Sequence, residues 1–401
     1  MDSPRGRIYL LAAGVSGRVE LTPTVVAHFD SCLGCMACET ACPSGVRYAP
    51  LIEQARSVIE MYHTRPIGTR LFRRILLRVL THPLRMRLVA SPLVVLGWAR
   101  SLLRRSGVLA RLPGHLGTIV HLAPDVTVGA LFASTPAITP AVSARRTRVG
   151  LLTGCTQRAL FGHLNQAAAR VLAAEGCEVA APARQECCGA LALHSGDRLT
   201  ARESARRLIE VFDAEHVERV VVSTAGCGST MKEYGELLAD DPRWAQRARE
   251  FSARVADVTE VLADLAPAVA PRHPVAIRAA YHDACHLAHA QGVRQQPRDL
   301  LRAIPSLTLI ALEDSDLCCG SAGIFNLVQP DMAADLGRRK EARIDESGAD
   351  IVITSNVGCM LQIEAAGRAA GRSRPVVHIV EVLDASIRNV ALRALRAPPG
   401  P

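Results

Sequence analysis

Aromatic residues, lysine and long apolar runs are all scarce in this chain of 401 residues. Aromatic side chains make up 3% of the residues, so the hydrophobic cores have to be built from Ala, Leu and Val. Only two basic residues are lysines, Lys232 and Lys340, and the others are arginines. The closest approach to a membrane span, residues 88–98, falls short of the roughly 20 apolar residues that a spanning helix needs, and Pro92 interrupts it.

Several kinds of catalytic centre are also missing from the sequence. No dinucleotide fingerprint, phosphate-binding loop or Ser/His/Asp nucleophile arrangement stands out. Without a flavin or nicotinamide site, the chain has no obvious hydride acceptor of its own. We therefore expect that the chain alone is not catalytic.

Size and charge set broad limits on the fold and on the partners. A chain of 401 residues that is 49% hydrophobic can bury more than one core, so two or three domains are expected. The net charge of +9 favours an acidic partner or an anionic membrane surface.

The cysteine content is the most informative feature of the composition. There are 13 cysteines, an odd number, and the first residues lack the apolar segment of a secretory signal. We therefore expect a reducing, cytoplasmic location, in which the cysteines are thiols or metal ligands rather than disulfides.

Four regions differ in composition, and we take them as predicted domains. Residues 1–60 hold a cysteine run, and residues 61–145 form a basic helical region with a Pro-, Thr- and Ala-rich linker from residue 112. Residues 146–270 and 271–401 alternate strand-like and helix-like stretches, which favours an α/β fold with a largely parallel sheet.

The strongest motif lies in the first region. Cys32, Cys35, Cys38 and Cys42 form the pattern C-x2-C-x2-C-x3-C-P, which is typical of bacterial ferredoxins and predicts a [4Fe–4S] cluster. The alternative is a zinc ribbon, which usually needs two separated C-x2-C pairs.

The last two regions repeat one cysteine pattern. The first set is Cys155, Cys187, Cys188 and Cys227, and the second is Cys285, Cys318, Cys319 and Cys359. Because the spacing is kept almost unchanged between the sets, it indicates a duplicated domain. Several of these cysteines follow closely on predicted strands, so each set could meet at the carboxyl edge of a sheet.

The sequence leaves the role of these two sets open. Four thiolates could hold an iron–sulfur cluster or zinc, or the cysteines could pack as small hydrophobic residues. Cys177 has no counterpart in the second half, so we expect it to serve packing. His194, His282 and His286 lie near the sets and could hydrogen-bond to a bound cluster or serve as ordinary loop residues.

The duplicated pattern resembles the cysteine-rich CCG domain of heterodisulfide reductase subunits, anaerobic glycerol-3-phosphate dehydrogenase, lactate-utilisation proteins and glycolate oxidase. A ferredoxin-type segment followed by two such domains is similar to the iron–sulfur subunit of glycolate oxidase. Local sequence agrees over Asp2–Leu10, Cys42–Val46, Leu152–Cys155 and Cys318–Gly323. The resemblance implies a small α-helical ferredoxin-like segment followed by two duplicated α/β cysteine-rich (CCG) domains.

The same resemblance implies a function and partners. The chain would be an electron-transfer subunit that passes electrons from an FAD subunit, which oxidises glycolate or a related 2-hydroxyacid, toward a membrane quinone. The alternatives are a subunit of another CCG-containing oxidoreductase, acting in glycerol-3-phosphate or lactate oxidation, and a zinc-stabilised scaffold without a redox role.

Two departures from the family pattern matter. Cys227 and Cys359 are not followed by the C-x2-C ending of heterodisulfide reductases, so a fifth ligand is missing from each set, which counts against disulfide reduction. Furthermore, the family places the segment Asp2–Arg7 after a first ferredoxin motif, whereas here it follows Met1. We expect that a first motif is missing from this sequence, and the alternative is a genuine single-cluster variant.

Residues 61–111 contain eleven arginines and no acidic residue. Mixed with Leu, Val and Ile, they predict amphipathic helices. Such helices could be an ordinary solvated surface, or could face either an acidic partner subunit or the anionic inner face of the cell membrane. Nucleic acid is not expected, because aromatic residues are not interleaved with the arginines.

Overall fold

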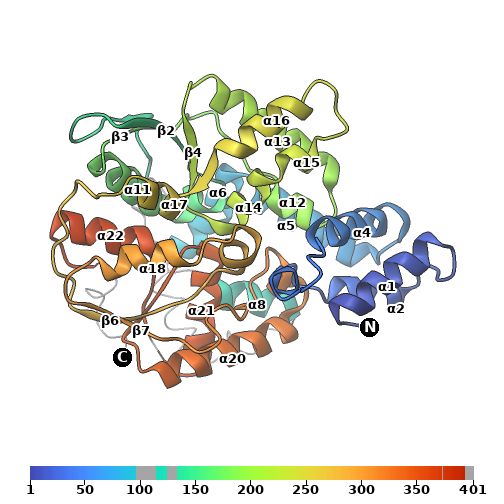
Figure 1. The fold of residues 1–401 in the computed structure, drawn as a ribbon. Coiled ribbons are helices and arrows are strands. Elements are labelled where there is room, and N and C mark those ends of the chain that lie inside the picture. Colours follow the sequence, from blue (N-terminus) through green and yellow to red (C-terminus); the bar gives the residue numbers. More distant parts are fainter. Residues whose placement is uncertain (96–113, 124–132, 373, 393–401) are drawn as a thin grey trace.

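The computed structural model describes residues 1–95, 114–123, 133–372 and 374–392. Two α/β units face each other across a layer of helices, and a small helical N-terminal segment packs at one side of both (Figure 1). The predicted fold class is therefore confirmed, while the domain boundaries at residues 60, 145 and 270 stay predictions.

The first α/β unit is built on a five-stranded sheet with the order β1-β3-β2-β4-β5. All neighbouring strands are parallel except β1, which runs antiparallel to β3. The strands are β1 (Ile138–Thr139), β2 (Thr147–Leu152), β3 (Cys177–Ala180), β4 (Arg219–Val222) and β5 (Val255–Asp257). The helices are α10 (Thr156–Leu160), α11 (Gly162–Ala174), α12 (Ala190–His194), α13 (Arg198–Asp213), α14 (Ala225–Lys232), α15 (Tyr234–Leu237), α16 (Ala245–Arg254) and α17 (Val258–Asp264).

The second unit repeats this plan with a four-stranded parallel sheet of order β7-β6-β8-β9. The strands are β6 (Ile277–Tyr281), β7 (Leu307–Ile310), β8 (Ile351–Thr354) and β9 (Val376–His378). The helical elements are the π-helix η2 (His286–Ala290), α18 (Gln295–Arg302), α19 (Phe325–Val328), α20 (Pro330–Ser347), α21 (Val357–Ala369) and α22 (Ile379–Arg388). The order matches β3-β2-β4-β5 of the first sheet, as expected for a duplication.

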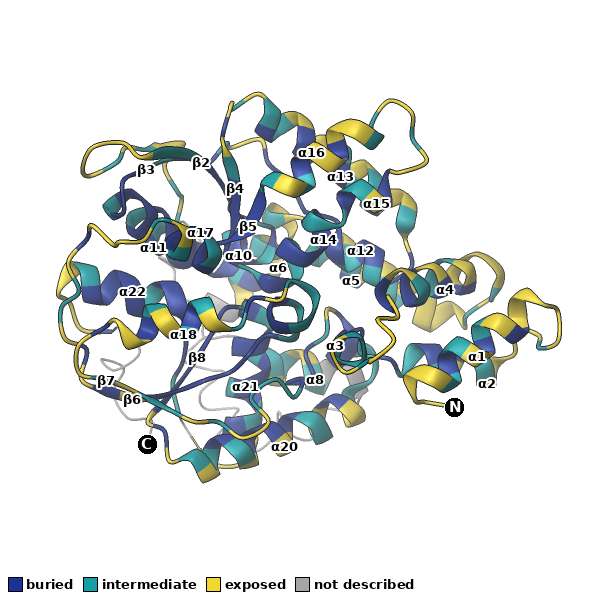
Figure 2. Cartoon of the chain, viewed as in Figure 1, coloured by how far each residue is buried: buried dark blue, intermediate teal, exposed yellow. Residues whose placement is uncertain are grey.

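The two units share one hydrophobic core. Helix α11 packs on α22, and α17 packs on α18, so helices from both units fill the layer between the sheets. The continuous core includes Leu164 and Leu172 of the first unit and Ile351 and Leu383 of the second. Figure 2 shows that these inner helix faces and the central strands β2, β4 and β8 are mostly buried. The units are therefore fixed relative to each other by apolar packing.

The N-terminal segment has a small core of its own. Its helices are α1 (Pro4–Val15), α2 (Pro23–Asp30), α3 (Ala37–Thr40) and α4 (Ala49–Tyr62). Phe29, Ile52 and Ile59 lie at the centre of this core. Ser3 and Thr22 accept hydrogen bonds from the first turns of α1 and α2, each of which begins with proline, so both helix starts are capped.

The described part of the basic region forms helices that cover the α/β units. They are α5 (Ile67–Leu80), α6 (Pro83–Val95) and α8 (Gly114–Leu122), and the last of these lies inside the predicted linker. Helix α6 packs on α5 and α10, whereas α8 packs on α19 and α21. Across the described residues, no helix combines the length and the apolar character that crossing a membrane would need.

The shared core predicts that the two units unfold together. Replacing Leu172 with Ala should lower the free energy of unfolding by about 2–5 kcal/mol, because the side chain is fully buried and a cavity would remain. Urea denaturation followed by circular dichroism should show one transition at a lower midpoint. The control variant Leu199→Ala, at an exposed position, should change little. If the second unit of Leu172→Ala unfolded in a separate transition with the wild-type midpoint, the two units would not share a core.

Candidate metal centres

Three cysteines of the N-terminal run form one group. Cys32, Cys35 and Cys38 lie on the loop after α2 and on α3, and Gly34 and Met36 between them adopt left-handed backbone conformations. The Gly34 N–H points at the Cys32 sulfur at 3.4 Å. Burial, followed by the neighbouring thiols Cys35 and Cys32, raises the pKa of Cys38 to about 11. The turn therefore brings three sulfurs together and directs backbone N–H groups toward them.

Cys42 lies in a different environment. Backbone N–H groups of Val46 and Ser44 lower the pKa of its thiol, and no other cysteine is among the leading influences on it. In two-cluster ferredoxins the fourth cysteine of a run binds the other cluster, and the position of Cys42 agrees with that rule. Its role as a ligand stays a prediction.

The first duplicated set meets at the carboxyl edge of the first sheet. Cys155 follows β2 and Cys227 lies on α14 after β4, while Cys187 and Cys188 precede α12. Hydrogen bonds link the thiols in the order Cys155, Cys187, Cys188, Cys227. Gly189 is required beside them, because its φ is +81° and a Cβ would lie 3.0 Å from the Ala201 backbone.

The second set has the same arrangement at the edge of the second sheet. Cys285 caps η2, Cys359 lies on α21, and the thiols are linked in the order Cys285, Cys318, Cys319, Cys359. The equivalent glycine, Gly320, has a φ of +93°. Cys177, in contrast, lies in the buried strand β3. Whether each set binds metal stays a prediction.

Both sets open onto one cavity of about 490 Å³. All eight cysteines of the two sets line it, together with apolar side chains of α5, α6 and α8. Within the part of the chain that the structure describes, no Arg, Lys, Asp or Glu lines the cavity, although the chain is strongly charged elsewhere. Its polar lining includes His194 and His286, whose rings lie 5.0 Å apart between centroids.

The N-terminal segment is docked beside this cavity by direct hydrogen bonds. His286, next to Cys285, lies with Nε2 2.9 Å from the Gly34 carbonyl oxygen. Arg56 donates to the His194 carbonyl oxygen at 3.1 Å, and His194 Nδ1 lies 3.2 Å from Glu53. The Cys35 thiol is close enough to Cys285 for the two to influence each other electrostatically. The three cysteine groups therefore lie side by side.

Comparisons with known proteins agree with this arrangement. The family model "Cysteine-rich domain" matches residues 149–232 and 279–364, and "4Fe-4S binding domain" matches residues 25–48. The chain is 36% identical to the probable glycolate oxidase iron–sulfur subunit of Bacillus subtilis, covering 95% of this chain and 87% of that protein. It is 32% identical to the glycolate oxidase iron–sulfur subunit of Escherichia coli, covering 97% and 89%.

The chain belongs to the family of glycolate oxidase iron–sulfur subunits. It is also 30% identical to lactate utilization protein A of Exiguobacterium sp., with 60% of this chain and 98% of that protein covered. The resemblance inferred from the sequence is therefore confirmed. The family is one of oxidoreductase subunits, and its cofactor is an iron–sulfur cluster.

The buried thiols fit such a cofactor chemically. A hydrogen bond to Cys187 and burial raise the pKa of Cys155 well above its ordinary value, and a hydrogen bond to Cys318 and burial do the same for Cys285. Thiols of this kind stay protonated unless a cation stabilises the thiolate, as bound iron or zinc does. The donor sets suit either metal.

Sequence reasoning missed the contacts that join the three groups. The hydrogen bond from His286 to Gly34 links residues 252 positions apart, and the cavity depends on how α5, α6 and α8 fold over the cysteines. The sequence offered one signal of this contact, His286 directly after Cys285, and a histidine at that position could equally have been an ordinary loop residue.

The ligand assignment of the N-terminal run can be tested with Cys35→Ser. We expect this variant to lose iron and the electron paramagnetic resonance signal of a [4Fe–4S] cluster, because one of three grouped thiols is gone, while circular dichroism shows the α/β units still folded. The control Cys177→Ser changes a cysteine outside the three groups and should keep the iron. Unchanged iron and signal in Cys35→Ser would show that the assignment is wrong.

Proposed function

We propose that this chain is the electron-transfer subunit of a glycolate-type 2-hydroxyacid oxidase. The observation that carries the proposal is the similarity to glycolate oxidase iron–sulfur subunits over nearly the whole chain, together with two cysteine sets that line one cavity and a third group held beside the second set. A separate FAD subunit would oxidise the 2-hydroxyacid, since this sequence has no flavin or nicotinamide fingerprint. The chain alone would not be catalytic.

The electron count of the proposed reaction is balanced by a quinone. A 2-hydroxyacid loses two electrons and two protons when it becomes a 2-oxoacid, and a quinone takes up two electrons and two protons when it becomes a quinol. Bound iron–sulfur clusters would supply one-electron carriers between the two substrates. The hydrogen bond between His286 and Gly34 holds the N-terminal run beside the second cysteine set, which keeps the distance between carriers short.

The cavity supports a neutral, apolar acceptor. Its volume of about 490 Å³ is in the range of small-molecule sites, and most of its lining is apolar. A carboxylate substrate would need a cationic partner, and none of the described residues that line the cavity is cationic. His194 can accept a hydrogen bond from a quinol hydroxyl, because its Nδ1 faces the Glu53 carboxylate and its Nε2 is buried without a hydrogen-bond partner among the described residues. We therefore place the quinone here rather than the hydroxyacid.

The outer face of α5 and α6 supports a membrane location. Ile67, Leu71 and Ile75 are exposed along one face of α5. Arg70, Arg74 and Arg78 are exposed beside them. The exposed side chains of α6 include Leu84, Arg85, Leu88 and Val89. Ile75 and Val89 also line the cavity, so the cavity reaches this exposed apolar face. An apolar face with arginines is suited to the anionic inner face of the cell membrane, where a quinone could enter.

Three other functions are testable alternatives. The similarity to lactate utilization protein A favours lactate oxidation as a second candidate, although it covers only 60% of this chain. Glycerol-3-phosphate oxidation is a further candidate, and it is tested by supplying glycerol-3-phosphate as the substrate. A zinc-stabilised scaffold would contain zinc and no iron after anaerobic purification.

The proposed function is tested by reconstituting the chain with its FAD subunit. Glycolate should reduce the iron–sulfur signals of this chain and then a short-tailed, water-soluble quinone, and neither should change without the FAD subunit. Lactate and glycerol-3-phosphate, added in parallel, identify the substrate. Iron–sulfur signals that none of the three compounds reduces would refute the proposal.

The same assay tests the cavity. Val79→Trp should lower quinone reduction by roughly tenfold or more, about 1.4 kcal/mol of binding free energy, because the larger ring occupies the cavity that Val79 lines. Reduction of the iron–sulfur signals by glycolate should be unchanged. Val58→Trp, on α4 and outside the cavity, is the matched control. Equal quinone rates in the two variants would place the quinone elsewhere while leaving the proposed function intact.

Membrane binding is tested with vesicles that contain anionic lipid. The triple variant Arg70→Gln, Arg74→Gln, Arg78→Gln should bind them roughly 100-fold more weakly, since each arginine near the surface contributes about 1 kcal/mol. The control replaces Arg302, Arg338 and Arg339, which lie on α18 and α20, with Gln. If both triple variants co-sediment with the vesicles equally, the α5 face is not the membrane-binding surface.

A further inference from the structure

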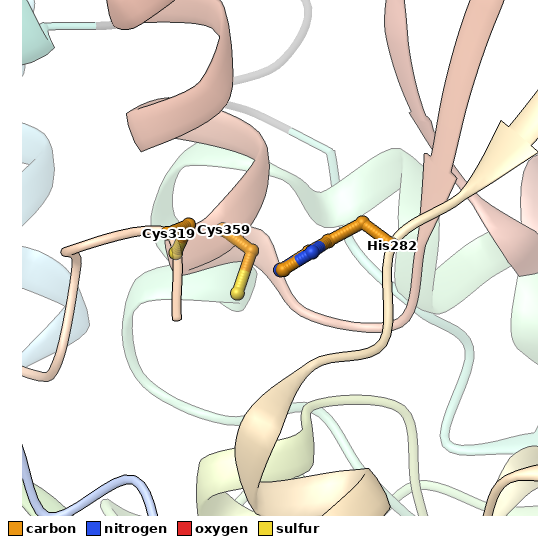
Figure 3. Close-up of side chains that lie close together, drawn as sticks. All are labelled: His282, Cys319 and Cys359. Atoms are coloured by element: carbon orange, nitrogen blue, oxygen red, sulfur yellow. The ribbon is translucent and has the colours of Figure 1, made fainter. Parts of the chain in front are cut away.

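The second cysteine set has a histidine that the first set lacks. His282 directly follows β6, and its backbone N–H donates to the Ile353 carbonyl oxygen of β8 at 2.9 Å. Its ring points toward Cys319 and Cys359 (Figure 3). A ring nitrogen and the two sulfurs all lie within 4.8 Å of one another, and all three residues are buried.

The hydrogen bonding of the ring leaves one nitrogen available. Nδ1 lies 3.1 Å from the carbonyl oxygen of Ser315, and because a carbonyl oxygen only accepts, Nδ1 carries the proton. Nε2 then carries the lone pair, and it is buried without a hydrogen-bond partner among the described residues. Histidines that bind metals usually donate their other ring N–H to a carbonyl or a carboxylate in this way.

The loop that orients the ring is itself fixed. Lys340 is buried, and its Nζ donates to the carbonyl oxygens of Asp314 at 2.6 Å and Ser315 at 3.2 Å. The Ser315 carbonyl therefore accepts from both His282 and Lys340, and its position is set by two donors. This arrangement holds the imidazole in one orientation before any ligand binds.

At the equivalent positions of the first unit, neither the histidine His282 nor the lysine Lys340 has a counterpart. Cys155 and Cys285 are 130 residues apart, so Leu152 occupies the position of His282. Leu152 is buried and belongs to the apolar core of the first unit. The part of α13 that corresponds to Lys340 on α20 carries Leu208 and Ile209, which are also buried in that core. The duplication has kept the thiols and changed what surrounds them.

We propose that His282 Nε2 is a metal ligand of the second cysteine set, together with Cys319 and Cys359. Metal–nitrogen bonds of about 2.0–2.1 Å and metal–sulfur bonds of about 2.3 Å would draw together the three ligand atoms, which already lie within 4.8 Å of one another. The two duplicated sites are then chemically different, with thiolates alone in the first and mixed thiolate and imidazole ligation in the second.

A difference in redox behaviour follows from this ligation. A neutral imidazole adds no negative charge, and the ammonium of Lys340 adds positive charge near the second set. Histidine ligands raise the potential of iron–sulfur centres relative to all-cysteine ligation. The second site should therefore accept electrons more readily than the first.

The test uses protein labelled with ¹⁵N-histidine and purified anaerobically. If the site holds iron, pulsed electron paramagnetic resonance should detect the strong coupling of a directly bound histidine nitrogen. If elemental analysis finds zinc, X-ray absorption at the zinc edge should show a nitrogen neighbour at about 2.0–2.1 Å beside sulfur at about 2.3 Å. The nitrogen signal should vanish in His282→Ala and persist in His289→Asn, which changes another histidine near the same set.

A second variant is needed because His282→Ala could lose its nitrogen signal simply by losing the metal. His282→Cys keeps a ligand at this position, so metal should remain bound while the nitrogen signal is lost and, for an iron site, the midpoint potential shifts to a more negative value. A nitrogen signal that survives in His282→Cys would refute the proposal. A metal-loaded wild-type protein with no directly bound nitrogen, or with only the weak coupling of a hydrogen-bonded one, would refute it as well.

Discussion

Burial of cysteine thiols is the constraint on which the rest of the structure depends. Eight thiols lie at the carboxyl edges of two parallel sheets, and several of them have pKa values raised well above the ordinary value by hydrogen bonds to neighbouring thiols and by burial. They can become thiolates only with a cation, so both edges are suited to metal. The shared core of α11, α17, α18 and α22 holds the two edges toward one cavity. Apolar packing far from the cysteines thus decides how far apart the two sites lie.

The N-terminal segment is attached to this centre by polar contacts rather than by a large core. His286, Arg56 and Glu53 connect it to residues beside both cysteine sets. These bonds are directional, and they place the ferredoxin run close to the second set. The helices of the basic region line the cavity with apolar side chains, and these reach the exposed face of α5 and α6.

Duplication explains the symmetry of the two units, and individual substitutions explain where they differ. The strand order, the Cys-Cys-Gly loops and the capping boxes at the start of α17 and α22 are repeated. His282 and Lys340 are found in the second unit only, where Leu152 and the pair Leu208 and Ile209 stand in the first. A backbone used twice can therefore supply two electrostatic environments for related sites, because a few buried side chains set the local charge.

The sequence by itself determined the chemistry of the centre and the general fold. The spacing of Cys32, Cys35, Cys38 and Cys42 indicated a [4Fe–4S] cluster, and the matched sets in each half indicated a duplicated α/β architecture while leaving their own role open, since ligand spacing and hydrophobic periodicity are local properties. The strands β1, β3, β5 and β9 escaped prediction, and β1, β5 and β9 have only two or three residues, which is too few to show periodicity. Only the tertiary structure decided that both sets share a cavity, that Gly34 contacts His286, and that His282 turns toward two thiols. Those relations join residues far apart in the chain, and they arise from how whole sheets and helices pack, which no local pattern encodes.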